Sequence, residues 1–214
     1  MIILYWMTPD PVVVEHTASL LDAVGLMQRH GVRRLPVVTG GDQLCGIVSR
    51  NDAMRHVGRL DFTQPVGPEL ERALSVVAVT DAMTPNPATC DSHDYVESVC
   101  ERMGREKVGA YPVLRRDHLV GIVSETDLLR ALAELAYASR PGRRITLRFP
   151  ADIDHEYVYR VVSLCRRFRL HLQAILTHPI LDEQALMMTL RLSGEQVDEL
   201  VALLRTQGYK VVDD

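Results

Sequence analysis

The pattern of apolar positions predicts the same set of elements twice. Residues 20–27 and 96–103 repeat apolar side chains with the i, i+3, i+4, i+7 spacing of an amphipathic helix. A short apolar run precedes each helix, at residues 12–14 and 88–90, and two short strands follow the first helix, at residues 35–38 and 44–48. Gly40-Gly41-Asp42 is the hairpin signal of the first copy, and Arg116-Asp117 stands in its place in the second. A second helix begins at Ser49 or Ser124, so each copy is predicted to be β-α-β-β-α.

The two copies also share residues at fixed positions. Shifting the sequence by 76 residues places residues 7–11 on residues 83–87, both beginning Met-Thr-Pro. After a one-residue gap, residues 46–52 meet residues 121–127, and both read Gly-Ile-Val-Ser-x-x-Asp. In total 16 positions are identical over about 48, clustered at predicted turns and caps. We conclude that the first two thirds of the chain are a tandem repeat.

The tail follows a different pattern. Apolar residues alternate from Ile145 to Phe149, then take helical spacing from Val158 to Cys165. Two more alternating stretches, a helix after Gly194 and a last short strand complete the order β-α-β-β-α-β, a ferredoxin-like arrangement. The predicted class is α+β, with five segments: repeat 1 (1–60), a connector (61–76), repeat 2 (77–138), a linker (139–143) and the tail (144–214). The connector is expected to be the most flexible part of the repeat region, because two prolines and a glycine interrupt it.

The Gly-Ile-Val-Ser-x-x-Asp motif permits two interpretations. Serine followed three residues later by a carboxylate, where a strand leads into a helix, is a capping box. The same geometry could bind a ligand, because free amides at a helix N-terminus attract phosphate and a carboxylate can accept both hydroxyls of a ribose. Arg55 and Arg130 lie three residues after each aspartate, and each could reach a phosphate or pair with its own Asp. The sequence leaves both alternatives open.

The paired motifs resemble a tandem of CBS domains, often called a Bateman module, over residues 1–138. The tail resembles an ACT domain, and the order of the whole chain is similar to the acetoin-utilisation family. This resemblance implies a non-catalytic regulatory module that binds AMP, ADP, ATP or S-adenosylmethionine in two clefts between the repeats. It also implies a role near acetoin catabolism, with a deacetylase-type protein partner.

The resemblance carries ligand-binding roles to specific positions. The aspartate would bind the ribose, and the serine with the residue before the aspartate would bind phosphate. Because the clefts are crossed, the base would meet the opposite repeat. One cleft would then combine Asp127, Ser124, Thr126, Ile122 and Arg130 with Val12, Val13, Arg33 and Arg34. The other would combine Asp52, Ser49, Asn51, Ile47 and Arg55 with Ala88, Thr89, Gly109 and Ala110.

The ACT-like tail departs from its family at the turn after the first strand. Amino-acid-binding ACT domains usually carry a glycine there, whereas residues 149–154 read Phe-Pro-Ala-Asp-Ile-Asp. We therefore expect a role in dimerisation or partner docking more than amino-acid binding. Arginines concentrate in the linker and tail, which is typical of a solvated surface or of docking to an acidic partner.

Charge and composition argue against nucleic-acid binding, a membrane span and a metal site. The net charge of −4 gives no overall positive field for nucleic acid, and no stretch is long and apolar enough to span a bilayer. Four separated cysteines suggest reduced thiols in a cytoplasmic protein, and the eight histidines form no metal motif. We expect a homodimer. The competing hypothesis is a constitutive interaction scaffold in which the Ser-x-x-Asp motifs are only helix caps.

Overall fold

The computed structural model describes residues 1–40, 43–136, 140–150, 156–180 and 183–212. They form two compact units, residues 1–129 with the two repeats and residues 130–214 with the tail. Some positions that the sequence pattern singled out lie outside the described residues: Gly41, Asp42, Ser139, Asp152 and Asp154.

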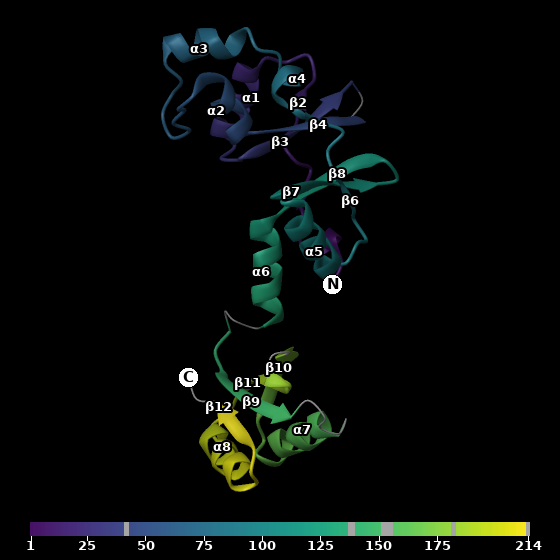
Figure 1. The fold of residues 1–214 in the computed structure, drawn as a ribbon, viewed down its shortest axis with the longest axis vertical. Helices are drawn as coiled ribbons and strands as arrows, with labels where there is room; N and C mark the ends of the chain where they lie inside the picture. The colour runs from purple at the N-terminus through teal and green to yellow at the C-terminus, as the bar shows by residue number, and fades with distance from the viewer. Residues whose placement is uncertain (41–42, 137–139, 151–155, 181–182, 213–214) are drawn as a thin grey trace. The chain divides into compact units, whose positions relative to one another are not determined.

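The first repeat has the predicted helices and the predicted pair of strands, which are antiparallel (Figure 1). Its elements are β2 (Val14–Glu15), α1 (Leu20–Arg29), β3 (Arg34–Thr39), β4 (Gln43–Ser49) and α2 (Arg50–Val57). Ser19 caps α1 in a capping box with Asp22, and the four apolar residues of the predicted stripe are fully buried. They pack with the buried side chains of β3, and burial of each of the larger side chains, Leu20, Val24 and Met27, contributes about 1.5–3 kcal/mol. The strand predicted at residues 12–14 is shifted, because only Val14 of that run pairs with β3.

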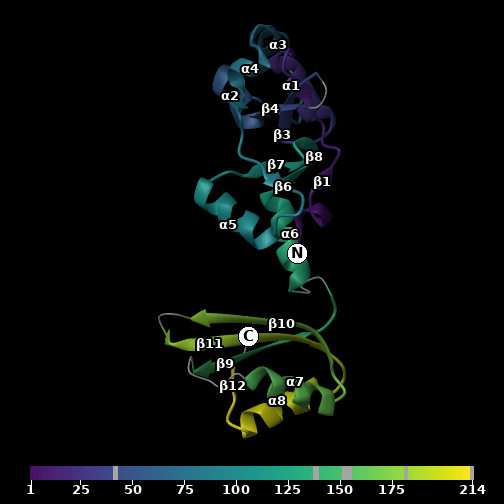
Figure 2. The ribbon, with the colours of Figure 1, turned by 90° about the vertical axis from the view of Figure 1, so that its right-hand side faces the viewer.

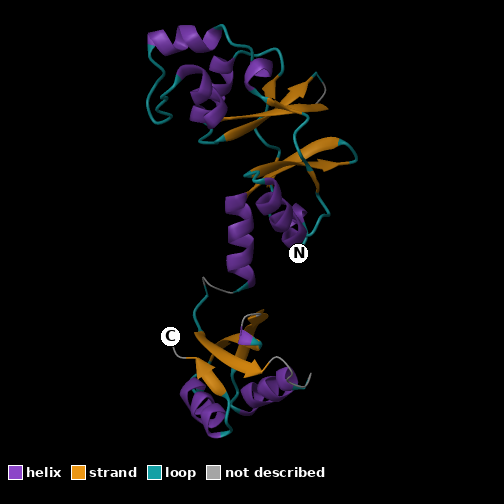
Figure 3. Cartoon of the chain, in the orientation of Figure 1, coloured by secondary structure: helices purple, strands orange, loops and turns teal. Residues whose placement is uncertain are grey.

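The second repeat has the same plan. Its elements are β6 (Cys90–Asp91), α5 (Val96–Glu106), β7 (Ala110–Arg115), β8 (His118–Ser124) and α6 (Glu125–Leu135). Arg116 and Asp117 form the predicted hairpin turn, and both have the positive φ that a two-residue turn of this hand requires (51° and 64°). Each repeat therefore presents a sheet with helices packed against it (Figure 3).

The two repeats exchange a strand. β1 (Thr8–Pro9), which follows the short 3-10 helix η1 (Ile3–Tyr5), pairs with β8 of the second repeat. In turn β5 (Thr84–Pro85) pairs with β4 of the first. The sheet orders are β2-β3-β4-β5 and β1-β8-β7-β6. Each Met-Thr-Pro motif thus completes the sheet of the other repeat, and β4 also contacts β8.

The glycines of the Gly-Ile-Val-Ser motifs make this exchange possible. A Cβ atom on Gly46 would overlap the Met83 side chain, and one on Gly121 would lie 2.6 Å from Met7 Sδ and 3.0 Å from the Thr8 carbonyl oxygen. Each methionine therefore fills the space that a side chain would occupy on the facing strand. The two repeated motifs fit one another in space.

The segment predicted as a flexible connector contains a helix. α3 (Pro68–Ser75) buries Leu74 completely, and α4 (Val79–Ala82) follows. α3 packs against α1 and α2, so this segment belongs to the core of the first repeat. The prediction of a flexible connector relied on the prolines and the glycine as helix breakers. In the structure Gly67 is the N-cap and Pro68 the first residue of α3, a position where proline is favoured.

The tail has the predicted β-α-β-β-α-β order (Figure 2). Its elements are β9 (Arg143–Pro150), α7 (Tyr157–Arg167), β10 (His171–Ile180), β11 (Ala185–Ser193), α8 (Val197–Thr206) and β12 (Lys210–Val212). The sheet order is β10-β11-β9-β12, with every neighbouring pair antiparallel. α7 and α8 pack on one face of the sheet, against alternate residues of β9 and β11.

The start of the tail is tied to its sheet. Arg191 Nη2 donates to the Arg140 carbonyl at 2.6 Å, and Gln173 Nε2 donates to the Pro141 carbonyl at 3.0 Å. Arg143, predicted as the last linker residue, is the first residue of β9. The described part of the predicted linker therefore belongs to the tail.

Candidate functional site

A cavity of about 750 Å³ lies between the two repeats. Eleven of the candidate residues named from the sequence line it: Val12, Arg33, Arg34, Ser49, Asn51, Gly109, Ala110, Ile122, Ser124, Thr126 and Asp127. The remaining candidates, all within the described chain, lie outside its lining: Val13, Ile47, Asp52, Arg55, Ala88, Thr89 and Arg130. The structure thus gathers most of the Asp127 cleft, together with residues assigned to the Asp52 cleft.

Asp52 is occupied by contacts within its own helix. Its Oδ2 accepts hydrogen bonds from the Ser49 amide and hydroxyl, both at 2.6 Å, and its Oδ1 pairs with Arg55. The Asp52 amide donates back to Ser49 Oγ at 3.3 Å, which completes the capping box. Asp52 is only 7% exposed. For Arg55, the structure therefore displays the intrahelical pairing that the sequence left open.

Asp127 has a similar cap contact but a different setting. Ser124 donates to Asp127 Oδ2 from its amide at 2.9 Å and from its hydroxyl at 2.6 Å. Unlike Asp52, Asp127 lines the cavity, and it is partly exposed. The cap contact therefore places the Asp127 carboxylate at the start of α6, at the wall of the cavity.

Both second helices of the repeats begin at the cavity. Arg50 and Asn51 of α2 line it together with Glu125 and Thr126 of α6. Helix N-termini carry partial positive charge and present amide groups, so two of them at one cavity favour an anion.

Arginines add full positive charges to this cavity. Arg33 is exposed, and Arg34 is half-buried with its guanidinium so close to Gly109 that a Cβ atom there would overlap it. Partial burial, and then the charge of Arg33, lower the pKa of Arg50. A bound anion would relieve this repulsion between the two cations.

Sequence reasoning missed part of the lining. Thr8, Asp10, Arg50, Met54, Phe62 and Glu125 also face the cavity. Arg50 and Glu125 directly follow the motif serines, so the helix-start geometry could have indicated them. Phe62 had no such signal, because it belongs to the segment predicted as a connector.

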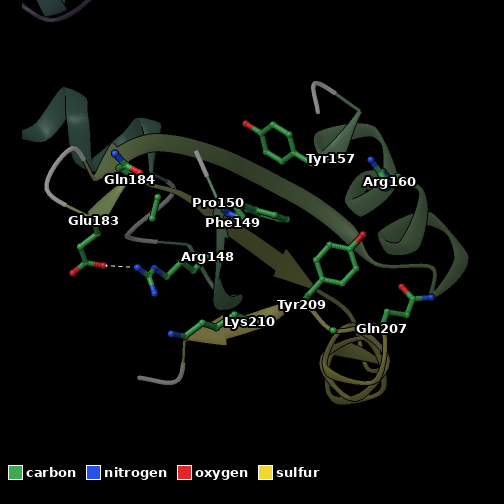
Figure 4. A pocket seen from close by; sticks show the side chains of 12 residues that line it. Arg148, Phe149, Pro150, Tyr157, Arg160, Glu183, Gln184, Gln207, Tyr209 and Lys210 are labelled. Carbon is green, nitrogen blue, oxygen red and sulfur yellow. Dashed lines mark ion pairs between the residues drawn. The ribbon is translucent and has the colours of Figure 1, made fainter. Parts of the chain in front are cut away.

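A second cavity, of about 710 Å³, lies in the tail (Figure 4). Phe149 lies between Tyr157 and Tyr209, with ring centroids 5.0 Å and 5.9 Å away. Arg148 pairs with Glu183 at 2.9 Å, which assigns one tail arginine to an ion pair. None of the candidate residues lines this cavity, and the turn with the ACT-family departure falls partly in residues outside the described chain.

The described residues include no cluster of three or more His, Cys, Asp or Glu side chains that could hold a metal ion. Nor does any described helix reach the length and apolarity required to cross a membrane. The four cysteines are free thiols, and burial raises the pKa of each, to about 12 for Cys90.

Comparisons with known proteins relate the repeat region to a protein family. The γ-3 subunit of 5'-AMP-activated protein kinase from Homo sapiens is 32% identical over 130 residues, which are 58% of this chain and 24% of that protein. The chain spans less than two thirds of the length of curated relatives such as this one.

Two solved structures match the repeat region. CBSX2 of Arabidopsis thaliana, crystallised in complex with AMP, is 27% identical with a TM-score of 0.52, and the match covers 63% of this chain and 97% of that one. A candidate acetoin utilization protein (AcuB) from Vibrio cholerae is 25% identical with a TM-score of 0.53, over 66% of this chain and 98% of that one. The CBS domain family matches residues 3–59 and 79–134. The chain therefore belongs to the CBS domain family, with two CBS domains in tandem.

Proposed function

We propose that this protein is a non-catalytic regulatory module that binds an adenine nucleotide in the cavity between its CBS domains. The observation that carries the proposal is that one cavity joins Arg33 and Arg34 of the first domain with Ser124, Thr126 and Asp127 of the second. The AMP complex of CBSX2 and the relationship to the kinase γ subunit support an adenosine ligand. S-adenosylmethionine is the other candidate ligand from the family.

Each part of the ligand would meet matching chemistry. Asp127 would accept the ribose hydroxyls. The amide groups at the N-terminus of α6 and the Thr126 hydroxyl would donate to phosphate, and Ser124 would do so by turning its hydroxyl from Asp127 to the ligand. Val12 and its neighbours would contact the base, and the two arginines would extend phosphate binding. The second ligand position implied by the family combines Asp52, Ser49 and Asn51 with Ala88, Thr89, Gly109 and Ala110; of these, Ser49, Asn51, Gly109 and Ala110 line the same cavity as Asp127.

The proposed mechanism is a ligand-dependent shift between arrangements of the two domains, which requires unequal affinity of the ligand for the two states. The protein would act in the cytoplasm as a homodimer and relay the signal to a protein partner. A deacetylase-type partner and a role in acetoin utilisation are proposed by analogy with the family. The β-α-β-β-α-β tail, residues 144–214, is proposed as an ACT-type domain that serves dimerisation or docking of a partner. It follows the two CBS domains and the linker, as predicted from the sequence.

A constitutive scaffold is the alternative function. The completed capping box at Asp52 favours it, because this motif is satisfied without any ligand. In that case the motifs contribute only helix stability, about 0.5–2 kcal/mol per cap.

Calorimetric titration of the purified protein with AMP, ADP, ATP and S-adenosylmethionine separates the two functions. Saturable binding of one of them, with a defined stoichiometry per chain, supports the regulatory module. No heat and no shift of the unfolding temperature with all four would refute it and leave the scaffold.

A further inference from the structure

The segment that follows the first CBS domain contributes an aromatic side chain to the cavity. Phe62 lies between α2 and α3, and it is half-buried against the core of the first domain. Among the described residues that line the cavity, it is the one aromatic side chain. A purine base is planar and apolar on its faces, so an aromatic ring in the wall of a site can stack against it.

The Phe62 ring is held in place by a neighbouring cation. The Arg50 guanidinium lies over the ring, 4.5 Å from its centroid. Arg50 is itself anchored, since its Nε donates to the Val32 carbonyl at 3.1 Å and its Nη2 reaches the Met27 carbonyl at 3.5 Å. One face of the ring is therefore covered, and a ligand can meet only the other face or the edge.

The backbone around Phe62 is also fixed. Asp61 Oδ1 accepts hydrogen bonds from the Thr63 amide at 2.8 Å and the Thr63 hydroxyl at 2.7 Å, which closes a local turn. Gln28 of α1 donates to the Gln64 carbonyl at 2.8 Å, and this bond ties the turn to the first domain. The segment thus presents a preorganised ring, which limits the ordering cost of binding.

We propose that Phe62 contacts the adenine base and helps to determine specificity for a purine, with Arg50 as its positioning residue. The apolar neighbours on this wall are Met54 and Val32, whereas Thr126 and Asp127 lie on the wall from the second domain. This inference rests on the proposed nucleotide function. It assigns to the segment between the domains a ligand contact that neither repeated motif supplies.

The test compares Phe62→Ala and Phe62→Tyr with the unchanged protein by calorimetric titration with adenosine, AMP and ATP. We expect Phe62→Ala to weaken all three by about tenfold, because the contact is with the base and not with the phosphates. Phe62→Tyr keeps the ring and should bind within about twofold of the unchanged protein. Arg50→Met should weaken adenosine by a similar factor through loss of ring placement, and AMP and ATP at least as much, because the Arg50 charge also faces the cavity. Phe62→Ala in that background should add little further loss of adenosine affinity.

Leu70→Ala is the matched control, because Leu70 packs on the same core from the same segment but does not line the cavity. It should lower the unfolding temperature and leave affinity unchanged. If Phe62→Ala fails to fold, Phe62→Leu keeps apolar packing without the ring and should show the same loss of affinity.

The outcomes separate the two proposals. If the unchanged protein binds none of the ligands, the nucleotide function is refuted, and this inference falls with it. If it binds and Phe62→Ala binds equally well, only the role of Phe62 is refuted. A loss that appears with ATP but not with adenosine also refutes the base contact.

Discussion

Replacing the motif glycines with alanine tests whether the exchanged strands are held by the fit of methionine against glycine. At Gly121 the new Cβ would fall 0.8 Å short of the 3.4 Å at which ordinary contact with Met7 Sδ begins, and 0.4 Å short for the Thr8 carbonyl oxygen. At Gly46 the three nearest atoms all belong to the Met83 side chain, with Cγ at 3.0 Å and Cε at 3.2 Å. Overpacking of this kind costs about 1–3 kcal/mol.

The two sites differ in how the strain can be relieved. Met83 can rotate away from Gly46, so Met83→Ala should remove the clash there entirely. At Gly121 the Thr8 backbone belongs to β1, which is paired with β8, so Met7→Ala should remove only part of the cost. We therefore expect Gly121→Ala to destabilise more than Gly46→Ala. The coupling energy with the facing methionine should be about 1–2 kcal/mol at Gly46 and smaller at Gly121.

Urea unfolding followed by tryptophan fluorescence measures these differences. The single tryptophan, Trp6, lies beside Met7 in the unit that contains both repeats, so it reports on that unit. Gly104→Ala is the control: it lies in α5 with no atom within 4 Å of the new Cβ, and it should stabilise by about 0.5–1 kcal/mol. Absence of coupling between Gly46→Ala and Met83→Ala, or a larger coupling at Gly121, would contradict the packing argument.

Three further predictions follow from the sites. Asp127→Ala should weaken nucleotide binding by about tenfold or more, whereas Asp52→Ala should mainly lower stability, because Asp127 lines the cavity and Asp52 is buried outside its lining. Equal affinities of both variants and the unchanged protein in calorimetry would argue against the ribose role. Burial raises the pKa of the Cys90 thiol to about 12 from 9.0, so at pH 8 it has on the order of a thousandfold less thiolate than an ordinary cysteine. Ellman's reagent should therefore label Cys90 only after unfolding. Rapid labelling of Cys90 in the folded protein would refute its burial. Burial raises the pKa of Cys90 and of Tyr111 in the folded protein to about 12, from 9.0 and 10.0. Between about pH 9 and 12 the unfolded chain loses these protons while the folded protein keeps them, so the free energy of unfolding should decrease over that range. A flat profile in alkaline urea titrations would contradict this.

The sequence predicted the elements well because they depend on local pattern. Helical spacing of buried residues identified α1 and α5, and alternation identified β9 and β11. Asp10 and Asn86, which occupy matching positions after Met-Thr-Pro, both adopt a positive φ near 45°, a conformation that Asp and Asn tolerate. Aligning the two repeats in the sequence therefore paired two positions that share the same left-handed backbone conformation.

What the sequence did not predict depends on contacts between distant residues. The strand exchange has no local signal, because pairing of β1 with β8 joins residues more than 110 positions apart. The prolines of this segment concealed the helix α3, although Pro68 is its first residue, and Phe62 could be placed in the cavity only once the path of that segment was known. The unequal settings of Asp52 and Asp127 likewise arise from packing, since the two motifs read alike.

Because the two CBS domains exchange strands, each domain would have an incomplete sheet if it were separated from the other. A fragment that ends at residue 59 would keep β4 but lose β5, and its edge would be left open to pairing with other chains. Two identical single repeats could close that edge only by lending their Met-Thr-Pro strands to each other. The tandem therefore has the arrangement of two strand-swapped single repeats that are joined into one chain. The first segment of the chain, β1, completes the sheet of the second CBS domain.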